Sequence, residues 1–234
     1  MHYAAILAGG SGVRMGNPDK PKQFFFVGEK PILVHTVEKF CVSGSFEKVL
    51  VLCPATWVQQ TRDLLQRFCP EFVSQIAVIQ GGETRNGTIL NSLKYLEQNG
   101  LLDDDAIVVT HDAVRPFVNL RIIEDNIAAA LKTGACDTVV PATDTIVESL
   151  DGDAISAIPD RHFLYQGQTP QSFNGRKLKE VLESLSDEEK AVLTDACKAF
   201  VLRGLPVQLV RGDASNIKIT YPQDLRVAET MLGE

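Results

Sequence analysis

A loop near the start of the chain combines glycines with two cationic side chains, a combination that could hold phosphate groups. It reads LAGGSGVRMG over residues 7–16 and PKQF over residues 21–24. Glycines let a backbone turn tightly and bring its N–H groups close to a phosphate, while Arg14 and Lys22 add positive charge. The apolar run 3–7 before the loop is expected to form a strand. The sequence therefore predicts a nucleoside triphosphate site at the carboxyl end of this strand.

Two familiar nucleotide-binding loops do not fit this segment. A P-loop requires Gly-Lys followed by Ser or Thr, a triplet that the sequence lacks. The dinucleotide fingerprint GxGxxG opens a helix, whereas here the third glycine, Gly16, comes one residue late and prolines follow at 18 and 21. A nicotinamide-dependent oxidoreductase is therefore disfavoured. The glycines alone would suit a plain strand-to-helix turn equally well, but the two cations favour the triphosphate loop.

Two further segments follow expected strands and carry polar or charged side chains. GGETRNGT at 81–88 opens an expected helix, whose free N–H groups favour an anion or a flat base, and Thr88 could bind a nucleobase or ribose. A simple capping segment explains this pattern equally well. HDAVRP at 111–116 supplies Asp112, a carboxylate suited to Mg²⁺ that also binds phosphate oxygens. Arg115 could bind phosphate or pair with Asp112, and His111 is expected to be structural.

Polar residues nearer the C-terminal end are further candidates, whose roles their types leave open. Arg161 follows an expected hairpin and could be an ordinary surface cation. The segment QGQTPQ at 166–171 could line a pocket, and Thr194 with Asp195 looks like the start of a helix. In NIKIT at 216–220, Lys218 lies on an expected short strand and is either exposed or directed at an anion.

Glycine loops, a metal-binding carboxylate and separated cations together favour nucleotidyl transfer. An oxygen of a phosphate monoester would attack the α-phosphorus of a nucleoside triphosphate and displace pyrophosphate. Such a phosphate is largely dianionic at neutral pH and needs no general base, which agrees with the absence of a Ser-His-Asp or Cys-His set. Positioning and charge neutralisation would then drive catalysis. A protein that only senses nucleotides would not need so many separated cations.

Composition limits the class of protein. The chain has 234 residues, 44% of them hydrophobic, and a net charge of −7. These values fit one α/β domain over 1–234 and disfavour a general nucleic-acid or membrane-surface binder. Its five cysteines lack CxxC spacing, which suggests reduced core thiols and no zinc site. With no signal peptide and no membrane-spanning run in the sequence, we expect a cytoplasmic protein.

These candidates need a scaffold of alternating strands and helices. Apolar runs predict strands at 49–53, 76–79, 106–110, 138–141 and 207–210, with amphipathic helices between them. The pattern indicates an α/β fold with a doubly wound, mostly parallel, Rossmann-like sheet, which binds ligands at the carboxyl ends of its strands. Residues 145–149 and 154–158 predict a hairpin within a protruding arm at about 141–165. The arm packs either on a partner subunit or back on its own domain.

Taken in order, these motifs resemble those of the sugar-phosphate cytidylyltransferases. The resemblance rests on LAGGSGVRMG with PKQF, GGETRNGT, HDAVRPF, TPQSF and NIKIT, and it spans residues 3 to about 230. It implies a nucleotidyltransferase fold, CTP as co-substrate, Mg²⁺ as the metal and a small polyol phosphate as acceptor. It also implies a homodimer formed through the hairpin arm.

The resemblance implies roles for individual residues as well. Arg14 and Lys22 match the catalytic residues that stabilise the transition state, and Asp112 matches the metal ligand. Arg161 would reach the active site of the other subunit. The implied acceptor site consists of Arg161, Thr169, Lys218 and Arg115. The implied CTP site consists of Leu7, Ala8, Gly9, Gly10, Gly82, Glu83, Thr84, Arg85, Asn86, Gly87 and Thr88.

Within this family, the segments 144–149, 165–171 and 193–198 look like those of the D-ribitol 5-phosphate branch. Ribitol 5-phosphate has an additional hydroxylated carbon and would need more polar partners, which Gln166 and Gln168 could supply. We therefore expect CDP-ribitol as the product, for a teichoic-acid-like cell-wall polymer. The alternative acceptor is 2-C-methyl-D-erythritol 4-phosphate, whose product enters isoprenoid synthesis.

Overall fold

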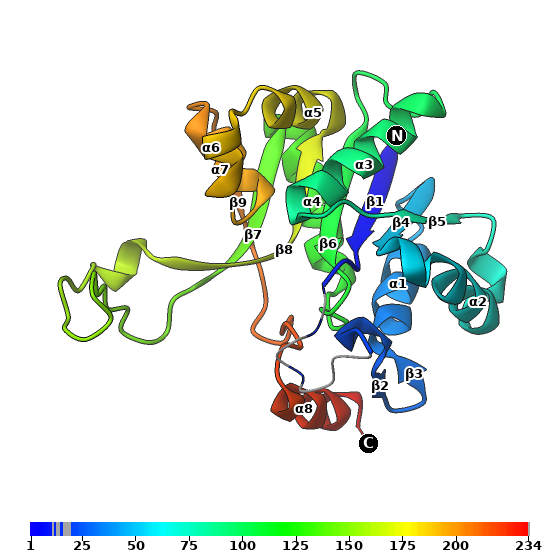
Figure 1. Ribbon diagram of the computed structural model, residues 1–234, viewed down its shortest axis with the longest axis horizontal. Helices are drawn as coiled ribbons and strands as arrows, with labels where there is room; N and C mark the ends of the chain where they lie inside the picture. Colours follow the sequence, from blue (N-terminus) through cyan, green and yellow to red (C-terminus); the bar gives the residue numbers. More distant parts are fainter. Residues whose placement is uncertain (11, 13–14, 16–19, 234) are drawn as a thin grey trace.

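A seven-stranded sheet forms the centre of the protein, with helices on both of its faces (Figure 1). The structure is a computed structural model that describes residues 1–10, 12, 15 and 20–233. The strand order is β5-β4-β1-β6-β8-β7-β9. The expected α/β fold with a mostly parallel sheet is therefore confirmed.

Four neighbouring strands form the parallel half of the sheet. They are β5 (Ile76–Gln80), β4 (Lys48–Cys53), β1 (His2–Leu7) and β6 (Ile107–Asp112). All three pairings among them are parallel. Their runs are apolar without alternation because both faces of the sheet are covered. Tyr3 and Ala5 pack into one core, whereas Ala4 and Ile6 pack into the other.

Each core is closed by its own set of helices. One face carries α1 (Ile32–Val42), α2 (Val58–Phe68) and α4 (Leu120–Thr133). The other face carries α3 (Arg85–Gln98), α5 (Gly175–Glu183) and α7 (Ala196–Leu202). The expected helices are thus present, and α3 begins four residues before the apolar pattern that predicted it at residue 89. The five cysteines are free and buried, as expected for core thiols.

Strand β8 (Tyr165–Asn174) was not expected, because its polar composition suggested a turn-rich segment. It pairs antiparallel with both β6 and β7 (Ala135–Pro141), and β9 (Gln208–Arg211) pairs parallel with β7. Buried polar groups are tolerated when they are hydrogen-bonded. Ser172 of β8 donates to Asn126, and the Pro170 and Gln171 carbonyls accept from Thr138 and Thr110. The polar residues of β8 therefore serve as internal hydrogen-bonding partners.

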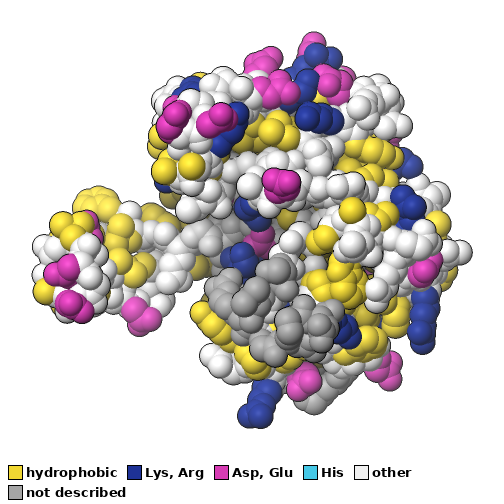
Figure 2. Space-filling view, in the orientation of Figure 1, with side chains coloured by type: hydrophobic (Ala, Val, Ile, Leu, Met, Phe, Trp, Pro, Cys, Tyr) yellow, Lys and Arg dark blue, Asp and Glu magenta, His cyan; other side chains and the backbone are white. Residues whose placement is uncertain are grey.

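The arm between β7 and β8 projects from the body of the molecule (Figure 1). The two expected strands do not form within it; a single bridge joins Glu148 and Ala157. The expected turn is present, with Asp151 accepting from the backbone of Asp153 and Ala154. Apolar side chains lie exposed along the arm (Figure 2). Because no core covers these side chains, the hairpin has little to hold it flat as two regular strands.

The remaining elements surround the carboxyl ends of the parallel strands. They are β2 (Phe26–Val27), β3 (Lys30–Pro31), α6 (Asp187–Ala191) and α8 (Pro222–Leu232). The short strand expected at 216–220 is absent, since this segment is irregular and its backbone bonds elsewhere: Ile219 N donates to Val114 O. Within the described residues, no helix combines the length and the apolar character needed to cross a membrane.

Candidate active site

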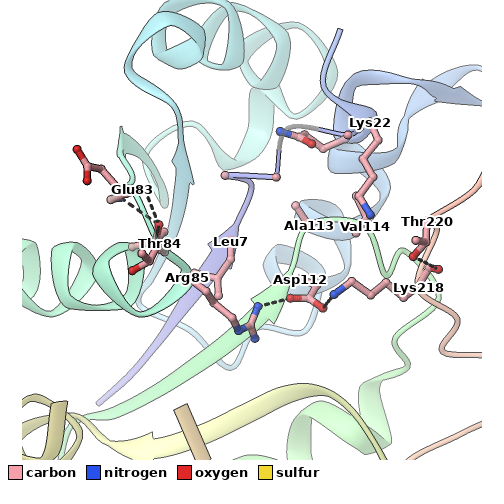
Figure 3. Close-up of a pocket in the computed structure, with 16 residues that line it drawn as sticks. Leu7, Lys22, Glu83, Thr84, Arg85, Asp112, Ala113, Val114, Lys218 and Thr220 are labelled. Atoms are coloured by element: carbon pink, nitrogen blue, oxygen red, sulfur yellow. Dashed lines mark hydrogen bonds and ion pairs between the residues drawn. The ribbon is translucent and has the colours of Figure 1, made fainter. Parts of the chain in front are cut away.

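A cavity of about 340 Å³ opens where β1 and β6 end and α3 begins (Figure 3). This is the edge at which parallel sheets of this kind bind ligands. Its wall includes most of the residues expected to bind nucleotide: Leu7, Gly9, Gly10, Gly82, Glu83, Thr84, Arg85 and Thr88. Three of the expected nucleotide-site residues do not line it: Ala8, Asn86 and Gly87. Ala8 is instead buried, and its carbonyl accepts from Gln23.

The turn at 81–88 is tightly packed and held by one hydroxyl. A side chain at Gly82 would collide with the backbone of Gly87, since its Cβ would lie 2.5 Å from the Gly87 carbonyl carbon. Thr88 Oγ1 accepts from Gly82 N at 3.0 Å and donates to Thr84 O at 2.9 Å. Thr84 caps α3 by accepting from Gly87 N. The Thr88 hydroxyl thus holds the loop in shape, a role that the sequence alone did not assign to it.

Lys22 reaches the same cavity from the other side. Its side chain is buried, and its Nζ donates to the carbonyl of Ile219 at 2.9 Å. Figure 3 shows the amine on the side of the cavity that faces Asp112. The second expected catalytic cation, Arg14, lies outside the described residues. The structure therefore places one of the two expected catalytic side chains in the cavity.

Asp112 forms the junction of the site, because three cations contact its carboxylate. Arg85 Nη1 pairs with Oδ1, and Lys218 Nζ lies 3.0 Å from Oδ2. Arg115 Nε lies 3.5 Å from Oδ2, and its Nη1 donates to Asn216 O. Burial alone would raise the pKa of Asp112, but these cations hold that pKa well below its ordinary value. Asp112 is therefore ionised at any physiological pH.

Thr169 and His111 hold the backbone around Asp112 in place. Thr169 Oγ1 accepts from Asp112 N at 3.1 Å and contacts His111 Nδ1 at 3.0 Å. The other ring nitrogen of His111 lies 3.1 Å from Arg115 O. Burial lowers the pKa of His111 to about 4, so the ring is neutral near pH 7. His111 has the structural role expected of it, while Thr169 supports Asp112 from the neighbouring strand.

A second, smaller cavity of about 160 Å³ adjoins the first. Arg85, Asp112 and Lys218 line both cavities, so no other wall separates them at this point. The remainder of the second cavity is lined by Arg115, Gly167, Gln168, Thr169, Gln171, Thr194 and Asp195. Three of the four expected acceptor-site residues therefore meet here.

Arg161 is the expected acceptor-site residue that the fold keeps away. It lies exposed at the base of the arm, where its Nη1 donates to Thr143 O at 2.8 Å. Gln166 is also exposed and lines neither cavity, and Gln168 bonds to Asp213 and Asn216 through its amide. Neither glutamine therefore offers the site the free polar group that the sequence analysis assigned to it.

Three buried polar residues beside the site were not identified from the sequence. Asn216 bridges the site by donating to Thr169 O, and Gln171 donates to Asp137 at 3.0 Å. Asp137 offered a signal, since it is an acidic residue inside an otherwise apolar strand. Gln171 offered none, because β8 itself was not recognised.

The donor set fits a magnesium ion that brings most of its ligands with a nucleotide. Among the described residues, no group of three His, Cys, Asp or Glu side chains could hold a metal ion. Mg²⁺ binds proteins through one or two carboxylates when phosphates supply further oxygens. Asp112 suits this role, provided that Arg85 releases its Oδ1. The Arg85 side chain is 25% exposed and has room to move.

Comparisons with known proteins agree with this geometry. A family model described as 2-C-methyl-D-erythritol 4-phosphate cytidylyltransferase matches residues 3–234. A 4-diphosphocytidyl-2C-methyl-D-erythritol synthase from Anaerococcus prevotii DSM 20548 is similar over 100% of this chain and 96% of its own, with TM-score 0.81 and 26% identity. A 2-C-methyl-D-erythritol 4-phosphate cytidylyltransferase from Francisella tularensis is similar over 98% of both chains, with TM-score 0.81 and 27% identity. The corresponding enzyme from Thermus thermophilus gives 98% of both chains, TM-score 0.74 and 26% identity.

These names carry methylerythritol phosphate, and the comparisons favour that acceptor over the ribitol phosphate preferred from the sequence. The terms concerning teichoic acid receive no support from them. The expectation of a cytidylyltransferase is confirmed.

Proposed function

The chain belongs to the 2-C-methyl-D-erythritol 4-phosphate cytidylyltransferase family, and we propose that it transfers the cytidylyl group of CTP to 2-C-methyl-D-erythritol 4-phosphate. One observation carries this proposal: two cavities meet at Asp112, Arg85 and Lys218. The larger cavity suits the nucleotide, and the smaller suits a compact phosphate. Substrates bound in them would bring their phosphates together at the junction.

The reaction needs alignment and positive charge more than it needs a base. An acceptor phosphate oxygen forms a bond to the α-phosphorus of CTP, and the bond from that phosphorus to the β-phosphate oxygen breaks. The acceptor phosphate is largely dianionic near pH 7, so no proton has to be removed. Lys22 would neutralise charge on the transferred phosphoryl group and on the departing pyrophosphate, together with Arg14.

Lys218 and Arg115 support the acceptor end of this proposal. Both lie in the smaller cavity, where they could bind the acceptor phosphate while still contacting Asp112. We place Arg161 in the site of a second copy, because the arm holds it away from the site of its own chain. Such a homodimer would cover the exposed apolar side chains of the arm, which include Leu150, Ile155, Ile158 and Phe163.

Magnesium would bind to Asp112 and to the phosphate oxygens of CTP. When bound, it would withdraw charge from the triphosphate and help pyrophosphate to leave. Asp112 also has a role of its own, since it holds Lys218 and Arg115 at the junction of the two cavities.

D-Ribitol 5-phosphate is a second candidate acceptor, favoured by the lining of the smaller cavity. Each residue that lines it is charged, polar or glycine. A methyl branch on the acceptor would find no aliphatic side chain there to pack against, whereas an additional hydroxyl group would find polar partners.

Pyrophosphate release from CTP and Mg²⁺ tests both candidates, with each polyol phosphate supplied separately. Release with methylerythritol phosphate alone would support the first proposal. Release with ribitol 5-phosphate alone would transfer the assignment to the second candidate. Release with neither acceptor would contradict both.

A further inference from the structure

Two buried hydrogen-bond acceptors beside the smaller cavity have fewer donors than they can accept. Gln171 lines this cavity and is only 2% exposed. Its Nε2 donates to Asp137 Oδ1 at 3.0 Å, whereas its buried Oε1 has no hydrogen-bond partner in the described part of the chain. Buried polar atoms are nearly always paired, so an orphaned carbonyl oxygen in a cavity wall points to a ligand that supplies a donor.

Asp137 is the second under-donated acceptor. It lies on β7 directly behind Gly167, where a Cβ would approach its Oδ2 to 3.7 Å. Gly167 itself lines the cavity and has no side chain with which to cover the carboxyl. Burial raises the pKa of Asp137 to about 6, and the nearby Asp195 contributes to the rise. A carboxyl group that costs this much to ionise serves no purpose in the sheet itself.

The charges around the cavity divide it into two sides. Arg115 and Lys218 make one side cationic, which suits a phosphate. The opposite side is made by β7, β8 and the start of α7, and it presents the oxygens of Gln171, Asp137 and Asp195. One of the Asp195 oxygens accepts from Lys198 N at 2.9 Å, which fixes the orientation of the carboxyl. Phosphate oxygens would be repelled from this side, whereas hydroxyl groups can donate to it.

We infer that Gln171 and Asp137 recognise the hydroxyl groups of the acceptor and thereby determine which polyol phosphate is used. Gln171 accepts a hydroxyl hydrogen through Oε1, and Asp137 holds the amide in the orientation that this requires. The inference rests on the proposed function and deepens it, because it assigns specificity to two residues that the family resemblance did not include. Gln168, the glutamine expected to do this from the sequence, is occupied by Asp213 and Asn216.

A metal ion is a weaker interpretation of the same oxygens. Asp137 and Asp195 are two carboxylates, yet no group of three possible ligands is found among the described residues. The Asp137 side chain already accepts from an amide donor, which a cation would not tolerate on the same oxygen. Hydroxyl donors satisfy Gln171 Oε1 and Asp137 together without displacing any existing hydrogen bond.

Gln171→Leu tests the inference directly, because leucine removes both amide atoms while keeping a side chain of similar length. Steady-state pyrophosphate release would give KM for CTP and KM for the acceptor, with D-ribitol 5-phosphate and 2-C-methyl-D-erythritol 4-phosphate assayed separately. Gln208→Leu is the matched control, since Gln208 lies exposed on the neighbouring strand β9. Methyl phosphate, used as a competitive inhibitor, reports on the phosphate side alone because it has no hydroxyl group.

We expect Gln171→Leu to raise KM for the preferred acceptor about 10- to 100-fold, the loss of one or two hydrogen bonds, with KM for CTP changed less than 2-fold. The inhibition constant of methyl phosphate should not change. Asp137→Asn keeps an oxygen for the Gln171 amide, so its effect on KM should be smaller than that of Gln171→Leu. If Gln171→Leu unfolds, Asp137→Ala replaces it and should raise the acceptor KM in the same way.

Two outcomes would overturn the inference. An acceptor KM that is unchanged in Gln171→Leu and Asp137→Ala would show that neither residue recognises the acceptor. An equal rise in the acceptor KM and in the methyl phosphate inhibition constant would show a general distortion of the cavity. If the wild-type protein releases pyrophosphate with neither polyol phosphate, the proposed function fails and the inference fails with it; activity in the wild type separates the two failures.

Discussion

Replacing Asp137 by asparagine should make the folded protein more stable at neutral and alkaline pH. Burial raises the pKa of this carboxyl from 3.8 to about 6; the hydrogen bond from Gln171 and the charge of Arg85 oppose the rise, whereas Asp195 adds to it. One pKa unit is worth about 1.4 kcal/mol, so ionising Asp137 in the folded protein costs about 3 kcal/mol more than in the unfolded chain. Asparagine is neutral and can still accept from Gln171 Nε2.

The sign of the pH dependence follows from the raised pKa. Folding favours the protonated carboxyl, so its contribution to stability is fully present below about pH 4 and is lost as the pH rises through 6. At pH 8 the whole ionisation cost applies to the wild type and none of it to Asp137→Asn. We therefore expect the variant to be about 2–3 kcal/mol more stable at pH 8 and nearly equal to the wild type at pH 4.

Urea unfolding followed by circular dichroism at pH 4, 6 and 8 would measure this difference. Linear extrapolation gives the free energy of unfolding in water for each protein. Asp153→Asn is the control, because Asp153 is an exposed aspartate on the arm. The reasoning is wrong if Asp137→Asn is no more stable than the wild type at pH 8. It is also wrong if the variant gains the same stability at pH 4 as at pH 8.

Four further outcomes are expected. Lys22→Met should lower kcat by about 10²–10³, because it removes a cation from the developing charge, and stopped-flow turnover would measure the loss; an unchanged kcat would remove Lys22 from catalysis. EDTA in excess should abolish pyrophosphate release and added Mg²⁺ should restore it, whereas activity that survives full chelation would contradict a metal role for Asp112. Thr88→Val should raise KM for CTP about tenfold by releasing the Gly82 turn, and Thr88→Ser, which keeps the hydroxyl group, should stay near wild type. Ile158→Glu on the arm should shift the protein from dimer to monomer in sedimentation velocity; a dimer that persists would place the interface elsewhere.

The sequence predicted the parallel half of the sheet because its strands carry continuous apolar runs. It predicted the nucleotide side for a related reason: glycines and charged residues follow those strands directly, as at Gly82 and Asp112. Strand β8 escaped prediction because its buried side chains are polar, and only their partners on β6, β7 and α4 show why they are tolerated. The role of Gln171 could not be predicted, since it depends on Asp137, which is 34 residues earlier in the chain.

The expected short strand around Lys218 failed for a similar reason. Alternation along 216–220 suggested one, yet Asn216 and Ile219 bond to Thr169 and Val114 rather than to a neighbouring strand. Lys218 nevertheless points at an anion, Asp112, as one of its two expected orientations required. The residue type predicted the contact, whereas only tertiary pairing could decide the backbone.

The two cavities draw on different parts of the chain, and this division affects how such enzymes can diverge. The nucleotide cavity is lined mainly by residues before 115, and the smaller cavity mainly by residues after 166, with Arg85, Asp112 and Lys218 common to both. Substitutions in β7, β8 and the start of α7 could therefore change the acceptor while the triphosphate chemistry stays intact. Descendants of one ancestral enzyme could in this way supply different pathways, and an engineer could exchange acceptors by altering the second half of the gene alone.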